Sequence, residues 1–556
     1  MRSSTVIAGI LGLSLIAGAA TAAPPWPTLD KQLRQSRVQP GTPLEKLIQA
    51  NQDFSILRPE EASDKIQVPA WLRVYWRKAH PEAHYSAADP TGGYPHVLKE
   101  VAEWMMLHQD LVPDQADDPR APIADDDFDA PEKTAVSTNR RVSGAQTFPR
   151  SESDIRINFW NTSKIIAASN NVGGSGQQAQ YYSSDGGLTW GQSFLGLQAG
   201  DSFHSDPAVD WTSDGTAWSA TIGIDSTGTT LRMRAYKSTN GGATWVFDNT
   251  FSGTQTNTDK EMIWADHSAT SAFKDYVYAC WHNGNPAYVN RRTGPAGSWG
   301  SPVRVSRTET AGTAIGCDVK TNSAGEAFVF WPATGNRRIV VAKSTNGGST
   351  WGKPVVVATA KASYDIGVPA FANRRALIYA SGAAYKTATV NNVYVTWTDL
   401  TGAKGCTSAS NEPGTNAAST CKTRIWFARS TNGGATWGAP VIINNKPSRN
   451  DQFNQWIGVD ETTGRIAVIY YDTAGDPTRK TTNVWYQTSA DNGATWSAAT
   501  KLTTGATNET IAGADSGNQY GDYNSLSIYA GKIFPSWTDR RSAGKEEIWT
   551  VPVIEP

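Results

Sequence analysis

One short motif recurs five times along this chain of 556 residues, and it constrains the fold more than any other feature. Each copy starts with a serine, has Asp or Asn two places later, continues through glycine and closes on a tryptophan. The copies begin at Ser183, Ser238, Ser344, Ser430 and Ser489. A fixed motif that returns after roughly 50 to 100 residues predicts a repeat architecture, in which each repeat is one supersecondary unit.

The motif has the chemistry of a hairpin turn. Its serine and its Asp or Asn can bond to nearby backbone N–H groups, and its glycine can take the positive φ that a tight turn needs. Strand-like runs flank the copies, such as 232–237 before the second copy and 354–357 after the third. A further pattern, an apolar strand that in most units ends in an aromatic residue, is found at 164–169, 217–222, 276–281, 327–331, 393–397, 466–471 and 533–537. We therefore expect seven units of antiparallel strands.

The consensus S-x-[DN]-x-G-x-[TS]-W resembles the Asp-box of the sialidase-like β-propellers, also called the BNR repeat, over residues 150–555. This resemblance implies an all-β fold, a six- or seven-bladed β-propeller with Asp-box turns that serve as scaffold. Seven units favour seven blades, and the ring would then close with a strand from before Ser151, within 135–142. If the last strands instead complete the first blade, the ring has six blades.

Four segments follow along the chain. Residues 1–23 are predicted to be a signal peptide, because Met1-Arg2 precede an apolar stretch and the small-residue site Ala20-Thr21-Ala22. Residues 24–113 are predicted to be a small helical region, 114–133 an acidic linker and 134–556 the propeller. No later run has the roughly 20 apolar residues that span a bilayer. We expect a secreted or periplasmic protein.

The four cysteines fit an oxidising compartment. Cys406 and Cys421 bracket a polar loop and are predicted to form a disulfide. Cys280 and Cys317 fall in adjacent units, where they either pair or remain buried thiols.

The charge is close to balanced, with 50 basic and 51 acidic side chains. It therefore gives no reason to expect nucleic acid or an anionic membrane as a partner. The expected partner is a glycan or glycoconjugate, and the expected state is a monomer. No Cys/His cluster suggests zinc, and the aspartates of the linker lack the glycine and spacing of an EF-hand. No cofactor is expected, although an acidic rim could hold calcium.

In a propeller, the start of each inner strand and the loop after each middle strand share one face around the axis. In this chain those positions are rich in carboxylates, at Glu152, Asp154, Asp206, Asp259, Glu261, Asp318, Asp365, Asp451 and Asp522, and at Asp225, Asp399, Asp472 and Asp539. Paired carboxylates suit glycoside hydrolysis. Alternatively, such carboxylates cap backbone N–H groups and lock the blades together.

The resemblance to sialidases implies a tyrosine nucleophile, a glutamate that activates it, an acid and a cluster of arginines. Tyr523, which follows Gly521-Asp522, matches the position of the nucleophile; Glu261 is its candidate partner and Asp206 the candidate acid. The candidate substrate-binding residues are Arg374, Arg449, Arg540, Trp397 and Trp537. The chain departs from the family where the first arginine is expected, because 153–158 reads SDIRIN without the proline of the F/Y-R-I-P motif.

Two functions remain open from the sequence. The first is a secreted sialidase-like exo-glycosidase that retains anomeric configuration through Tyr523. Neutral sugars are as plausible as sialic acid for it, because the expected funnel is acidic and aromatic. The second is a non-catalytic propeller that binds a glycan or a protein on the same face.

Overall fold

The computed structural model describes residues 50, 51, 53, 56, 74, 77, 78, 135, 136, 138–307, 314–541 and 544–555. The predicted signal peptide and acidic linker lie outside these residues. So does the predicted helical region 24–113, apart from seven positions, of which 74, 77 and 78 are helical. The chain forms two compact units, and the larger one contains the described residues 139–184 and 190–555. The smaller unit includes strand β1 (Ala135–Val136) and the turn 185–189.

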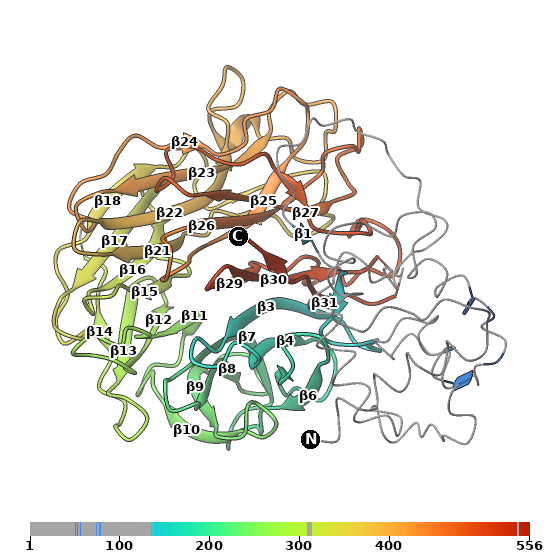
Figure 1. The fold of residues 1–556 in the computed structure, drawn as a ribbon. Helices are drawn as coiled ribbons and strands as arrows, with labels where there is room; N and C mark the ends of the chain where they lie inside the picture. Colours follow the sequence, from blue (N-terminus) through green and yellow to red (C-terminus); the bar gives the residue numbers. More distant parts are fainter. Residues whose placement is uncertain are drawn as a thin grey trace, which may run out of the picture. The chain divides into compact units, whose positions relative to one another are not determined.

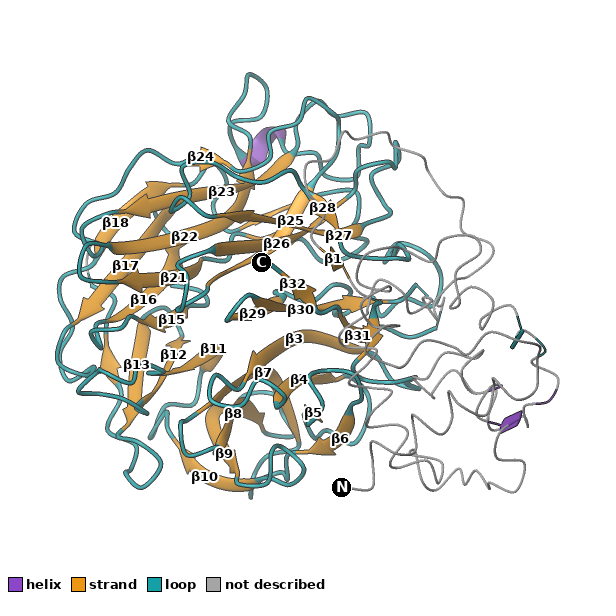
Figure 2. Ribbon diagram, in the orientation of Figure 1, coloured by secondary structure: helices purple, strands orange, loops and turns teal. Residues whose placement is uncertain are grey.

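The larger unit consists of antiparallel sheets set around a central axis (Figure 1), and strands and loops make up nearly all of it (Figure 2). The first sheet contains β3 (Arg150–Ile157), β4 (Ile165–Asn171), β5 (Ala179–Ser183) and β6 (Gly191–Phe194), and the second contains β7 (Phe203–Trp211), β8 (Ala217–Ile224), β9 (Leu231–Ser238) and β10 (Val246–Thr250). The third contains β11 (Thr258–Ala265), β12 (Val277–Asn283), β13 (Ala287–Arg292) and β14 (Val303–Arg304). The fourth contains β15 (Asp318–Thr321), β16 (Ala327–Ala333), β17 (Arg338–Ser344) and β18 (Val355–Thr359). In each sheet the strands follow one another in chain order, with the first one innermost.

The fifth and sixth sheets are β21 (Ser381–Lys386), β22 (Asn391–Leu400), β23 (Thr423–Ser430) and β24 (Val441–Ile442), and β25 (Gln452–Val459), β26 (Ile466–Asp472), β27 (Asn483–Ser489) and β28 (Thr500–Lys501). A separate hairpin, β19 (Asp365–Ile366) with β20 (Ala376–Leu377), precedes the fifth sheet, and a short 3-10 helix, η4 (Ala409–Asn411), lies in the loop before β23. All seven predicted middle strands coincide with observed strands.

The seventh sheet closes the ring. It contains β29 (Ser525–Tyr529), β30 (Lys532–Asp539), β31 (Glu547–Thr550) and β32 (Val553–Ile554). Its outer strand is β2 (Arg140–Arg141), which pairs with β31 through Arg140 opposite Thr550 and Arg141 opposite Trp549. The propeller therefore has seven blades, and the strand that closes it lies within the predicted segment 135–142. The alternative of six blades is wrong.

The repeated motif forms the predicted turn between the third and fourth strands of a blade. In the second copy, Ser238 Oγ donates to Asn240 Oδ1 (2.8 Å) and accepts from Gly242 N (2.9 Å), while Asn240 Oδ1 accepts from Thr244 N (3.0 Å). Gly242 has φ of 96°, which suits glycine. The closing Trp245 packs against a cluster that includes Ile166 and Val209, from neighbouring blades. The motif thus shapes the turn and fills the wedge between sheets.

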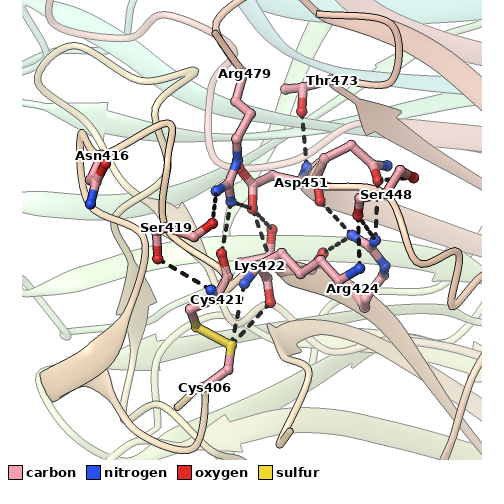
Figure 3. A network of polar contacts seen from close by, with 12 residues as sticks. Cys406, Asn416, Ser419, Cys421, Lys422, Arg424, Ser448, Asp451, Thr473 and Arg479 are labelled. Carbon is pink, nitrogen blue, oxygen red and sulfur yellow. Dashed lines mark hydrogen bonds and ion pairs between the residues drawn. A yellow bond between two sulfur atoms is a disulfide. The ribbon is translucent and has the colours of Figure 1, made fainter. Parts of the chain in front are cut away.

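The structure contains two disulfides. Cys406–Cys421 closes the loop before β23, as expected, and Cys280–Cys317 joins the third and fourth blades, which decides the open alternative in favour of a pair. Arg479 fixes the loop that Cys406–Cys421 closes, because it donates to Ser419 O and Cys421 O (both 3.0 Å) and forms an ion pair with Asp451 (Figure 3). No helix in the described part of the chain is long and apolar enough to cross a membrane.

Candidate functional site at the propeller axis

Four inner strands carry a bulge at the same end of the axis. The register of β3, β7, β11 and β25 shifts against the middle strand, and each bulge contains a residue with positive φ: Glu152 (54°), Asp206 (53°), Lys260 (53°) and Asn454 (48°). A left-handed conformation is uncommon for residues other than glycine, and bulges re-aim side chains near functional sites. The repeated strain identifies this end of the axis as the candidate site.

Charged side chains from distant blades meet there. Glu152 Oε1 accepts from Asp522 N (3.0 Å), and Glu152 Oε2 accepts from Asn170 Nδ2 (2.6 Å). Asp522 forms ion pairs with Lys260 and with Arg374. Arg374 also lies 3.6 Å from Glu152, measured from Nη1 to Oε1. The two cations of the cluster are therefore already paired with carboxylates.

Several carboxyl groups of this cluster hold their protons unusually tightly. Burial, together with the nearby Asp206 carboxylate, raises the pKa of Glu152 to about 7 and that of Asp259 to about 6. The same two causes raise the pKa of Glu261 well above its usual range. Neither carboxyl oxygen of Glu261, nor Asp206 Oδ2, has a hydrogen-bond partner, although all three atoms are buried. Buried carboxyl oxygens without partners are rare in folded proteins, and this marks the cluster as a candidate for chemistry.

Tyr523 lies within this acidic neighbourhood. Its hydroxyl donates to Pro207 O (3.3 Å), and its ring lies 5.8 Å from that of Tyr379 and 6.2 Å from that of Trp456, centroid to centroid. Burial and the carboxylates of Asp206, Glu152 and Glu261 raise the pKa of Tyr523 well above 10. The three predicted catalytic residues, Tyr523, Glu261 and Asp206, thus interact electrostatically although up to 317 positions separate them in the sequence.

Of the three predicted arginines, Arg374 joins the cluster. The β19–β20 hairpin carries it, and Gln519 Oε1 fixes that hairpin by accepting from Arg374 N (2.8 Å) and Asn373 N (3.2 Å). Arg449 is exposed on the loop before β25. Arg540 is buried elsewhere, where it donates to Asn508 O (3.3 Å) and Gly544 O (3.2 Å) and so holds a loop of the seventh blade.

The two predicted tryptophans lie inside blades. Trp397 is 1% exposed, and its ring stacks on Trp426 with centroids 6.4 Å apart. Trp537 is 0% exposed, and its Nε1 donates to Asp539 Oδ2 (3.0 Å). Because neither ring has an exposed face in this structure, neither can stack on a sugar, and the prediction that they bind substrate is wrong.

Other predicted carboxylates tie the blades together, as the structural alternative required. Asp154 Oδ2 accepts from Val209 N (2.8 Å) in the next inner strand, and Asp318 Oδ2 accepts from Gly382 N (2.8 Å) in the same way. Asp210 Oδ2, which was not singled out from the sequence, accepts from Ala265 N (2.7 Å). The acidic positions therefore include blade ties and members of the axial cluster, but others have local roles. Asp365, expected at the start of an inner strand, lies instead in the β19–β20 hairpin and pairs with Arg375, and Asp225 bonds within its own loop.

Sequence reasoning did not assign a role to Lys260 or Tyr379. Lys260 stands between two acids at the start of an inner strand, and this pattern could have marked it as their counter-charge. Tyr379 donates to Cys317 O (2.9 Å) from just before β21, and no local pattern marks it. Among the described side chains, no group of three or more His, Cys, Asp or Glu is placed to hold a metal ion.

One family model and several solved structures are similar to this chain. Residues 414–514 match a family described as a BNR repeat-like domain, which confirms the resemblance to Asp-box propellers. Similar solved structures include the α-L-arabinofuranosidase Arb93A from Fusarium graminearum (12% identity, TM-score 0.42, covering 76% of this chain and 98% of that one). The intramolecular trans-sialidase from Ruminococcus gnavus is also similar (11% identity, TM-score 0.39, covering 59% and 93%). A protein of unknown function from Dyadobacter fermentans has 12% identity and a TM-score of 0.41, covering 76% and 99%. No curated protein matches the chain.

Proposed function

We propose that this propeller is an exported exo-glycosidase that removes a terminal sugar from a glycan and retains its anomeric configuration. The observation that supports this proposal is the convergence of Tyr523, Glu261 and Asp206 at one end of the axis, with buried carboxyl oxygens that lack hydrogen-bond partners. Perturbed carboxyl groups beside a nucleophilic side chain are typical of active sites. The two disulfides support an oxidising destination such as the periplasm or the cell exterior.

In this mechanism Tyr523 Oη attacks the anomeric carbon while Glu261 accepts the phenolic proton. Burial raises the pKa of Glu261 well above its usual range, so only its ionised form can act as this base, and that form binds the phenolic proton strongly. The bond to the leaving oxygen breaks as Asp206 gives that oxygen a proton, a step that requires Asp206 in its protonated form when the sugar binds. Water, deprotonated by Asp206, then attacks the glycosyl–tyrosine bond and returns the phenolate, which regains its proton from Glu261.

The charges of the cluster favour a neutral sugar as the substrate. Recognition of a carboxylated sugar needs guanidinium groups free to bind the carboxylate through two hydrogen bonds. Here Arg374 is paired with Asp522 and lies beside Glu152, and Lys260 is paired with the same Asp522. A substrate carboxylate would have to displace these partners.

The test is release of free sugar from a panel of nitrophenyl glycosides and oligosaccharides, followed by NMR, which also reports the anomer formed. We expect Tyr523→Phe and Glu261→Gln each to lower kcat by about 10²-fold or more. Tyr288→Phe is the matched control, because Tyr288 lies on β13, the third strand from the axis in its blade, and this variant should keep full activity. If the folded wild-type protein releases no sugar but binds glycans, the non-catalytic propeller is the correct alternative.

A further inference from the structure

A pocket of about 360 Å³ opens at the other end of the propeller axis. Glu152 lies near the start of β3, whereas the pocket residues Phe159 and Trp160 follow its end. At about 3.3 Å per residue, the inner strand separates the two ends by roughly 20 Å. Turns from six of the seven blades line the pocket, and its volume falls within the range of small-molecule sites.

Aromatic rings form one wall of this pocket. Phe159 stacks on Tyr529 with centroids 4.2 Å apart and lies 4.3 Å from the ring of His267. Trp160 borders the same imidazole at 5.7 Å and is 38% exposed. Tyr385 and Tyr529 are half-buried. Such partly exposed rings offer apolar surface beside polar tips, the combination that packs against the C–H face of a sugar ring.

Polar groups that the fold leaves unused surround these rings. Within the described chain, the Trp160 indole N–H and the hydroxyls of Tyr385 and Tyr529 make no hydrogen bond, although all three residues line the pocket. His267 Nδ1 forms an ion pair with Glu461 Oε1 at 3.6 Å, a distance too long for a direct hydrogen bond. Because no direct hydrogen bond joins this ion pair, both its donor and its acceptor can bond to a ligand in the pocket.

The charges around the pocket exclude strongly ionic ligands. Burial lowers the pKa of His267, but the Asp210 carboxylate 2.9 Å away outweighs it and raises this pKa to about 9, so the ring is cationic at neutral pH. An organic cation would meet this imidazolium, and an anion would meet Glu461. Lys386 is already paired with Glu326 (3.0 Å). A neutral ring with several hydroxyls fits both groups, because a hydroxyl donates to the carboxylate and accepts from the imidazolium.

We propose that this pocket, lined by Phe159, Trp160, His267, Tyr385, Glu461 and Tyr529, is a second carbohydrate site that binds one neutral sugar unit. The sugar stacks on the aromatic wall, donates to Glu461 and accepts from His267 and Trp160. Because the pocket and Tyr523 lie at opposite ends of the axis, binding here does not depend on glycosidase activity at the other end.

The experiment is titration of the full chain with D-glucose, D-galactose, D-mannose, L-arabinose and N-acetyl-D-glucosamine, monitored by saturation-transfer NMR up to roughly 50 mM, since single-sugar sites often have millimolar Kd. We expect at least one sugar to bind saturably. Trp160→Ala and Glu461→Gln should each raise its Kd at least tenfold. Phe194→Ala removes an aromatic ring of matching exposure (40%) on β6 and should leave the Kd within twofold.

Tyr523→Phe separates the two ends of the axis. Sugar binding that survives Tyr523→Phe and weakens in Glu461→Gln supports the second site, whether or not the wild type shows hydrolysis. If no sugar binds, or if the Kd is the same in Trp160→Ala, Glu461→Gln and wild type, the proposal is overturned. Binding that Tyr523→Phe abolishes and Glu461→Gln preserves overturns it too, because the sugar then occupies the other end. If Trp160→Ala proves less stable than wild type, the Kd of Glu461→Gln decides the test, because that substitution replaces only one atom of a half-buried side chain.

Discussion

At the scale of single residues, Glu152 makes the stability of the propeller depend on pH. Its folded pKa, about 7, exceeds the ordinary value of 4.5, so its contribution is fully present below about pH 4.5 and is lost as the pH rises through 7. We expect wild type to lose up to about 3 kcal/mol relative to Glu152→Gln between pH 5 and 8. Urea unfolding at a series of pH values gives the free energy of unfolding of both proteins as a function of pH, and the slopes of the two curves should differ.

Glu326 provides the control for that experiment. Burial alone would raise its pKa, but hydrogen bonds from Lys343 and Asn322 outweigh it and lower the pKa to about 2. Its contribution is therefore constant above about pH 4.5, and Glu326→Gln should keep the wild-type slope between pH 5 and 8. Equal slopes for wild type and Glu152→Gln would contradict the assignment of Glu152.

Residue identities were easier to predict than residue roles. Tyr523, Glu261 and Asp206 could be named because they precede or start inner strands, which a repeat places around one axis. The bulges at Glu152, Asp206 and Lys260 could not be predicted, because a shift of register depends on the partner strand. The same holds for Trp397: its place at the end of a middle strand is a local pattern, but its stacking on Trp426 depends on the register of the next strand in the same blade.

At the scale of elements, the disulfide loop before β23 depends on a buried ion pair. Arg479 Nε and Nη2 donate to Asp451 (2.8 and 2.6 Å), and neither side chain is exposed. Removing one partner leaves the other charge buried, so Arg479→Met should cost about 3–5 kcal/mol. Arg479→Met with Asp451→Asn should recover part of this loss. Urea unfolding of the two single variants and the double variant completes the cycle.

A matched change on the surface tests whether the effect belongs to burial. Arg375 pairs with Asp365 and with Glu412 (both 2.7 Å), but its side chain is 40% exposed. Arg375→Met should cost less than about 1 kcal/mol, because exposed ion pairs contribute little. Similar losses for Arg375→Met and Arg479→Met would argue against a special role of the buried pair.

The β19–β20 hairpin is the element that sequence patterns missed. Each of its strands has two residues, too few for a period of alternation, and its position is set by Gln519 from the seventh blade. This is why Arg374 could be proposed as a binding residue while its ion pairs with Asp522 and Glu152 could not. The Asp-box turns were predictable because all their hydrogen bonds lie within a few residues.

At the scale of the whole molecule, the closing strand β2 should control the stability of the entire ring. Asn139, next to β2, donates to Leu502 O (2.8 Å) and accepts from Thr504 N (3.0 Å), which links the seam to the sixth blade. Asn139→Ala leaves the buried Leu502 carbonyl without this partner and should cost about 1–3 kcal/mol. Calorimetry should show the main transition moving as a whole to lower temperature. Asn249→Ala, at an exposed position on β10, is the control and should not shift it.

The blade number itself was within reach of the sequence, since seven apolar middle strands could be counted. The closing strand was harder to place because β2 pairs over two residues only, and its partner β31 lies about 400 positions away. A two-residue strand is too short to show an alternation of apolar and polar residues, so the sequence does not reveal its pairing with a distant strand. A melting profile of Asn139→Ala with an early partial transition, and not a shift of the whole, would mean that the blades unfold independently of the seam.

The aspartate ties between inner strands have an evolutionary consequence. Asp154, Asp210 and Asp318 each bond a backbone N–H of the following inner strand, so the donor is main chain and is present whatever the sequence of that strand. A gene segment that encodes one blade therefore brings its own fastening to the next when it is duplicated. Lineages of such rings can gain or lose a blade without first evolving a new pair of complementary side chains.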